Sequence, residues 1–174
     1  MVEQDHDCEA LAQKRRATKQ LPYHFVESGL PNVYLVGIRY FACPRCRKQS
    51  AEIPAVNQLL TALARILVEK ETTLTGEELR FLRKRLSKKA LEMAEVLAVE
   101  PEHYSRLETG KLQISAASDK IVRAYYALQS NDPMLQKSAV LKQALETRRK
   151  PHGTANIAAS LAKGSQWKTG ENAA

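Results

Sequence analysis

The sequence predicts an α+β protein that is mostly α, in which a small N-terminal β unit is joined by a linker helix to an all-α helix–turn–helix domain. Three observations predict this fold class. β-Branched and aromatic residues form two short runs within residues 33–41. Two cysteines with the spacing of metal ligands follow these runs directly. From residue 54 onward, apolar residues recur at helical intervals instead.

Residues 1–53 make up the predicted β unit. Residues 33–36 and 38–41 have the composition of strands and are interrupted at Gly37, which predicts a hairpin or a single bulged strand. A unit of about forty residues has too little apolar core to be stable alone. A bound metal ion is a common additional support, so the sequence predicts a zinc-type β unit.

Cys43 and Cys46 are the clearest candidate metal ligands. Two thiolates separated by two residues around a tight turn bind one zinc ion with both sulfurs. A redox pair is the competing interpretation, but it belongs at a helix N-terminus in a βαβ unit, whereas this pair follows a predicted strand. Structural zinc requires four ligands. The predicted set is His6, Cys8, Cys43 and Cys46, with Asp5 or His24 as alternatives to His6.

The linker helix is predicted within residues 54–74, with Pro54 in its first turn. Residues 72–75 break the helical pattern and mark the boundary of the next domain. The apolar positions that form one stripe of this amphipathic helix are Val56, Leu59, Leu60, Leu63, Ile66 and Leu67.

Residues 75–130 are predicted to form a compact run of short helices. Two helices of about eight residues are joined by a short turn at residues 98–100. Ala94 is small where the two helices would cross closely, while Tyr104 and Leu107 point back into the core. This spacing is typical of a helix–turn–helix motif.

The outer face of the second helix carries side chains that can read base edges in a major groove. Arg106 can form bidentate hydrogen bonds to guanine, and lysines before and after the motif suit the flanking phosphates. The alternative is a helical bundle with a solvated charged face, and periodicity alone leaves both open. The candidate DNA-binding residues are Lys88, Lys89, Glu102, His103, Ser105, Arg106 and Lys111.

The charge distribution also favours the DNA-binding interpretation. The chain has 27 Lys and Arg against 19 Asp and Glu, a net charge of +8, which attracts polyanions such as nucleic acid. Residues 131–174 hold seven basic and three acidic residues. We expect a basic helix over 131–150 and a disordered tail over 151–174, which is rich in small polar residues. Residues 111–150 are expected to supply a dimer interface through the stripe Ile121, Val122, Tyr125 and Leu128.

Residues 82–110, which end in Ser-Arg-Leu-Glu-Thr-Gly, resemble the Xre/Cro-like helix–turn–helix family. Leu107 stands where the family usually has Trp, which keeps the core contact. Ala98 occupies the turn position usually held by Gly, so either the turn avoids a positive φ or it carries strain of roughly 1 kcal/mol. Ala90 stands where many members carry Gln, which removes one contact to DNA.

Residues 23–33, Cys43-Pro44-x-Cys46 and residues 74–84 together resemble MqsA-type antitoxins, the YgiT-type zinc-finger proteins. The resemblance covers about residues 5–130 in family order. It implies a bacterial, dimeric, zinc-bearing DNA-binding protein. The family's N-terminal Cys-x2-Cys corresponds here to Asp5-x2-Cys8, so one thiolate is absent, and Arg47 stands where the family has Gly.

The remaining features bound the location and the class of protein. No phosphate-cradling Gly-rich loop, Gly-x-Ser-x-Gly or His-Glu-x2-His occurs, so we expect no enzyme. No run approaches the ~18 apolar residues of a membrane span. The acidic first ten residues do not resemble a signal peptide. Three cysteines, an odd number, favour the reducing cytoplasm, with the protein at the nucleoid when bound.

We therefore expect a sequence-specific transcriptional repressor of the antitoxin type, which binds a palindromic DNA operator as a homodimer and contains structural Zn²⁺. The alternative is an antitoxin that acts mainly by neutralising a cognate toxin through protein–protein contact.

Overall fold

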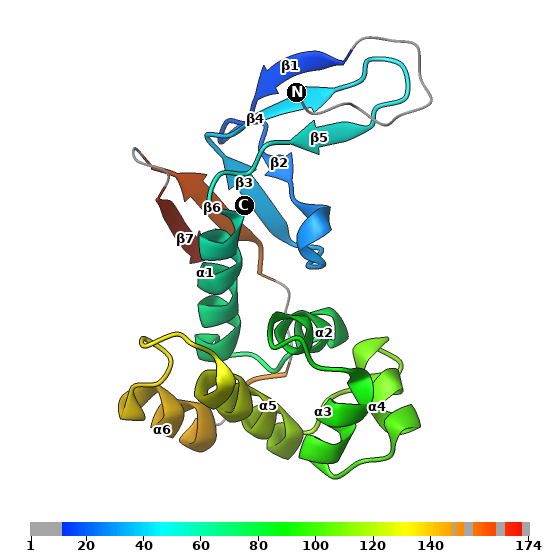
Figure 1. Ribbon diagram of the computed structural model, residues 1–174, viewed down its shortest axis with the longest axis vertical. Coiled ribbons are helices and arrows are strands. Elements are labelled where there is room, and N and C mark those ends of the chain that lie inside the picture. Colours follow the sequence, from blue (N-terminus) through cyan, green and yellow to red (C-terminus); the bar gives the residue numbers. More distant parts are fainter. Residues whose placement is uncertain (1–11, 148, 152–154, 163–165, 172–174) are drawn as a thin grey trace.

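The computed structural model describes residues 12–147, 149–151, 155–162 and 166–171 of the 174-residue chain. These residues form seven strands, arranged in two sheets, and six α-helices. The molecule is elongated, with the two sheets at one end and most of the helices at the other (Figure 1). None of the helices in the described part of the chain has the length and hydrophobicity that a membrane span requires.

The first sheet is antiparallel and has three short strands in the order β1 (Gln13–Arg16), β4 (Arg39–Ala42) and β5 (Gln49–Ala51). Tyr40 and Ala42 are buried on one face of β4, whereas all four residues of β1 are exposed. The turn between β4 and β5 contains both cysteines of the predicted zinc knuckle.

The second sheet joins both ends of the chain. Its strand order is β2 (Tyr23–His24), β3 (Val33–Val36), β6 (Ile157–Leu161) and β7 (Trp167–Glu171), and only the β3–β6 pair is parallel. The predicted hairpin or bulged strand is therefore wrong, because β3 and β4 belong to different sheets. Gly37, with φ of 88°, lies where the chain passes from one sheet to the other.

The prediction of an all-α C-terminal part with a disordered tail over 151–174 is wrong for the described residues. Ile157 is only 3% exposed and pairs with Val33, while Ala159 is fully buried. The indole nitrogen of Trp167 donates a hydrogen bond to the carbonyl of Pro54 over 2.8 Å. Small side chains predominate in β6, which lies between β3 and β7 and has the sequence Ile-Ala-Ala-Ser-Leu. The fold is an α+β arrangement in which the C-terminal strands complete the N-terminal β layer.

All six α-helices lie between β5 and β6 in the sequence. α1 extends from the sheets toward the other helices, contacting β7 as well as α2, α5 and α6 (Figure 1). It buries Leu59, Leu63 and Leu67 along one face. The elements are α1 (Val56–Glu69), α2 (Gly76–Arg85), α3 (Ala90–Leu97), α4 (Pro101–Glu108), α5 (Ala116–Gln129) and α6 (Ser138–Glu146), with a 3-10 turn, η1, at Val26–Ser28.

A buried arginine fixes the end of α1 to α5. The side chain of Arg123 is 0% exposed, and its guanidinium donates to both carboxylate oxygens of Asp119 at 2.9 and 3.0 Å. It also donates to backbone carbonyls at and just after the C-terminal end of α1, where helix carbonyls lack intrahelical partners. These carbonyls belong to Leu67, Val68, Lys70 and Thr72.

Candidate nucleic-acid interface

The turn between α3 and α4 has a left-handed residue at its start. Ala98 ends α3 with φ of 52°, and the amide of Val99 donates to the carbonyl of Ala94 over 3.0 Å. The turn therefore uses a positive φ at the position where the resembling family has Gly, and it carries strain of roughly 1 kcal/mol. Pro101 then begins α4, at a position where its missing N–H removes no helical hydrogen bond.

Helix α4 has one buried and one exposed face, as the spacing of its residues predicts. Tyr104 is fully buried and Leu107 is 3% exposed, so this face packs into the core. Burial raises the pKa of the Tyr104 hydroxyl well above its ordinary value. The opposite face is exposed and carries Glu102, His103, Ser105 and Arg106.

Arg106 lies on this outer face in an exposed ion pair. Its guanidinium contacts the Glu102 carboxylate over 2.6 Å, and the two side chains are 53% and 78% exposed. An ion pair this open to water contributes little stability. Arg106 can therefore leave Glu102 for a stronger bidentate acceptor at small free-energy cost.

Basic residues lie at both ends of the motif. The Lys88 ammonium contacts the Glu92 carboxylate over 2.9 Å, and the amide of Lys89 donates to the same carboxylate over 2.7 Å. These two groups, the Lys89 amide first, hold the pKa of Glu92 below its ordinary value, and Glu92 in turn raises the pKa of Lys88. The exposed side chains of Lys89 and Lys111 form no ion pair within the described residues.

Two residues that the sequence did not single out hold α4 in place. Arg83 on α2 donates to both oxygens of the Glu108 carboxylate, at 2.6 and 2.9 Å, and to the carbonyl of Lys88 at 2.8 Å. One guanidinium thus links α2, the start of α3 and the end of α4. Glu108 lies four residues after Tyr104, on the buried face of α4, and an acidic residue at that position was the available signal.

Gly76 permits a close approach between α2 and α4. A Cβ atom at this position would lie 2.5 Å from the carbonyl oxygen of Leu107 and 2.7 Å from that of Glu108. Any larger residue would displace one of the two helices. The end of α4 is therefore positioned both by the Arg83–Glu108 pair and by this backbone contact.

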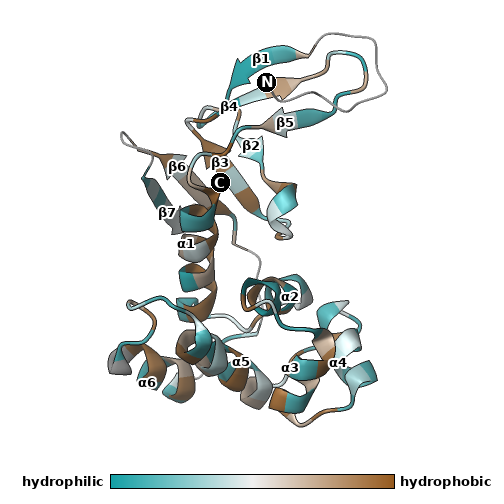
Figure 2. Cartoon of the chain, in the orientation of Figure 1, coloured by the Kyte–Doolittle hydropathy of each residue, from teal (hydrophilic) through white to brown (hydrophobic). Residues whose placement is uncertain are grey.

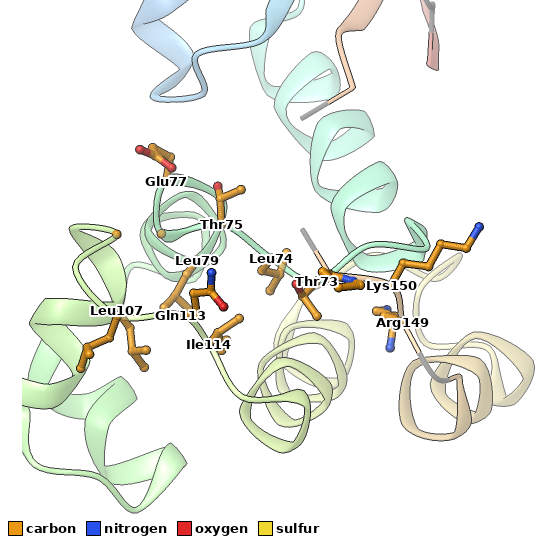
Figure 3. A pocket seen from close by; sticks show the side chains of 14 residues that line it. Thr73, Leu74, Thr75, Glu77, Leu79, Leu107, Gln113, Ile114, Arg149 and Lys150 are labelled. Atoms are coloured by element: carbon orange, nitrogen blue, oxygen red, sulfur yellow. The ribbon is translucent and has the colours of Figure 1, made fainter. Parts of the chain in front are cut away.

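A cavity of about 770 Å³ lies on the inner side of α4. It is bounded by the start of α2, the loop after α4 and residues 149–151 (Figure 3). Leu79 and Leu107 form part of its apolar wall, while Arg149 and Lys150 lie at the other side. The helix shows its Leu107 face to this cavity and its Arg106 face to solvent, so the cavity is separate from the proposed reading face.

Cys43 and Cys46 lie on one tight turn between β4 and β5. The amide of Cys46 donates to the sulfur of Cys43 over 3.5 Å, and the amide of Arg47 donates to the Cys43 carbonyl over 3.0 Å. Arg47 has φ of 60°, the left-handed conformation that Gly adopts more easily. The hydrogen bonds to the sulfur and the carbonyl of Cys43 keep this turn tight.

The other predicted ligands do not complete this site within the described residues. His6, Cys8 and Asp5 lie outside the described residues. His24 lies on the second sheet, where its ring stacks on Tyr34 with centroids 4.8 Å apart and its Nε2 lies 2.7 Å from the Pro31 carbonyl. The described residues bring no three potential metal ligands together.

The apolar stripe expected for dimerisation is divided on α5. Val122 is buried in the core and Tyr125 is half-buried, whereas Ile121 and Leu128 are 41% and 58% exposed. Only the last two, which lie seven residues apart on the same side of the helix, remain available to a second copy of the chain.

Comparison of this chain with known protein families, with curated protein sequences and with solved structures yields no match.

Proposed function

We propose that this protein is a sequence-specific DNA-binding transcriptional regulator, a repressor of the antitoxin type, whose helix α4 enters the major groove. The observation that carries the proposal is the exposed polar face of α4. Its four side chains are presented by a helix that Arg83, Glu108 and Gly76 hold rigidly against α2. A preorganised helix loses little conformational freedom when it binds.

Each residue of this interface has a distinct role in the proposal. Arg106 exchanges Glu102 for guanine, to which it forms two hydrogen bonds. His103 and Ser105 contact an adjacent base edge or phosphate. Lys88, Lys89 and Lys111 bind backbone phosphates on either side and supply the salt-dependent part of the affinity.

The proposed binding unit is a homodimer on a palindromic operator. Two-fold symmetry places two recognition helices about 34 Å apart, one turn of DNA. The exposed Ile121 and Leu128 on α5 support an interface that a second chain covers.

Arg106→Ala is expected to weaken binding to the cognate operator by about 1–3 kcal/mol and to relax specificity at one base pair of each half-site. The reason is the loss of the bidentate contact to guanine. The operator is first selected from a random-sequence duplex library with the parent protein, and both proteins are then compared by gel shift. Lys84→Ala, which removes an exposed charge from α2, is the control. Operator affinity and base preference equal to those of the parent would contradict the role of α4.

We also propose that the first sheet is supported by one structural Zn²⁺, held by Cys43 and Cys46 together with Cys8 and His6. The tight turn and the amide-to-sulfur hydrogen bond support two of these ligands. Elemental analysis of protein purified without chelators is expected to give one zinc per chain, and Cys46→Ser is expected to remove most of it. Zinc well below one equivalent in the parent protein would refute the proposal.

A further inference from the structure

The first sheet and its turns carry a large unbalanced positive charge. Residues 12–51 contain eight Lys and Arg but a single acidic residue, Glu27. This segment therefore accounts for nearly all of the chain's net charge of +8. Glu27 lies outside the first sheet, and its carboxylate accepts a hydrogen bond from the Tyr23 hydroxyl over 2.8 Å. It therefore does not neutralise the basic side chains of the sheet.

Three of these basic residues share one face of the sheet. In the antiparallel register Arg16 lies directly opposite Arg39, and Lys14 lies opposite Phe41. Cross-strand partners and residues two positions apart along a strand point to the same side, so Lys14, Arg16 and Arg39 form one basic face. All three are exposed, and Figure 2 shows β1 as a hydrophilic strand.

The arrangement of this face is unfavourable in the isolated protein. Like charges directly opposite each other on neighbouring strands destabilise a sheet, and Arg16 and Arg39 occupy such a pair of positions. Within the described residues, no Lys or Arg of residues 12–51 forms an ion pair with an acidic side chain. At the helical end, by contrast, Lys70, Arg83 and Arg123 each contact a carboxylate at 2.6 to 2.9 Å.

We propose that this basic face of the β1–β4–β5 sheet is a second DNA-binding surface, which contacts the phosphate backbone without regard to sequence. The inference rests on the proposed function, since α4 brings duplex DNA to the molecule and raises its local concentration at the sheet. Phosphates would offset the repulsion between Arg16 and Arg39. The sheet lies at the opposite end of the molecule from α4 (Figure 1). It therefore extends the contact to DNA that lies beyond the half-site read by α4.

The test compares two full-length variants that each lose three positive charges. The sheet variant is Lys14→Gln/Arg16→Gln/Arg39→Gln, and the control variant is Lys84→Gln/Lys150→Gln/Lys168→Gln, at exposed positions outside both proposed surfaces. Binding to a random-sequence duplex of about four helical turns is measured across a range of KCl concentrations. The slope of log affinity against log salt should become shallower by about 1 for each lost phosphate contact, thus by about 3 in the sheet variant. The control variant should retain the parent slope.

Three results would overturn the inference. The slope of the sheet variant could equal that of the parent, as it would if the four acidic residues among residues 1–11 neutralised the sheet. The two variants could change equally, which would assign the effect to net charge. The sheet variant could lose binding to phosphatidylserine vesicles while its DNA slope is unchanged, which would assign the surface to a membrane.

The experiments test the proposal for the basic face of the sheet and the proposal for α4 separately. Arg106→Ala should lower the preference for the selected operator and largely keep the salt slope on random duplex, whereas the sheet variant should do the reverse. If Arg106→Ala keeps the parent preference while the sheet variant still has a shallower slope, the sheet binds DNA and the role of α4 fails. Circular dichroism spectra matching the parent verify that both triple variants are folded.

Discussion

Arg123→Met is expected to lower the free energy of unfolding by about 3–5 kcal/mol, because it leaves a buried carboxylate without its main cation. Asp119 is 1% exposed, and Arg123 is its only cation closer than 3.5 Å among the described residues. Arg149 lies farther away, at 3.7 Å, and the Leu74 amide remains as a neutral donor at 2.8 Å. The substitution also removes the donor from the backbone carbonyls at the end of α1, and unpaired buried carbonyls add to the cost. Urea denaturation measures the change.

The chain contains a matched control for this experiment. Arg106 and Glu102 form an ion pair with the same four-residue spacing on a helix, but both side chains are more than half exposed. Arg106→Met should therefore change the free energy of unfolding by roughly 0–1 kcal/mol. If the two variants were destabilised equally, burial would not be the source of the effect, and the role given to Arg123 in joining α1 to α5 would be refuted.

The two short helices α3 and α4 and the turn between them could be predicted from the sequence because their determinants are local. The exposed and buried faces of α4 follow from the spacing of Tyr104 and Leu107, and Pro101 marks the start of the helix. The positive φ of Ala98 could not be predicted from the sequence. Whether a turn accepts a positive φ in a residue other than Gly depends on how firmly the packing of both helices holds it.

The residues that hold α4 could not be predicted with the same means. Arg83 and Glu108 are 25 positions apart, and their contact exists only because α2 crosses the end of α4. In sequence each looks like an ordinary charged residue of an amphipathic helix. The basic face of the first sheet could not be predicted from the sequence for a related reason. The charges of β1 are balanced by the acidic residues before it when the first twenty residues are summed, and only the register with β4 places Arg39 beside Arg16.

The sequence did not predict the C-terminal strands β6 and β7, because composition is a weak guide to strands whose partner lies far away in the sequence. The Asn32 side chain donates to the carbonyl of Ala155 across 123 positions, and the Ile157 amide donates to the Asn32 carbonyl over 2.8 Å. Small residues dominate residues 155–162, so the segment resembled a polar tail. In the structure Ile157 and Ala159 are buried and alternate with more exposed neighbours, but with only two buried positions the sequence carries a weak strand signal.

Ile157→Ala should therefore destabilise the protein by about 2–5 kcal/mol, the range for truncating a buried Ile, even though it lies in a segment of tail-like composition. Its side chain is 3% exposed and belongs to the same core as Val33 and Leu35, which are fully buried. The neighbouring Ser160→Ala, at an exposed position of the same strand, should change the free energy of unfolding by no more than about 0.5 kcal/mol. Urea denaturation of both variants decides between a strand and a tail. A loose tail predicts two equally small effects, whereas a strand inserted between β3 and β7 predicts a large effect at Ile157 alone. The amides of β3 should then also exchange hydrogen faster in Ile157→Ala, because the variant loosens the sheet that protects them.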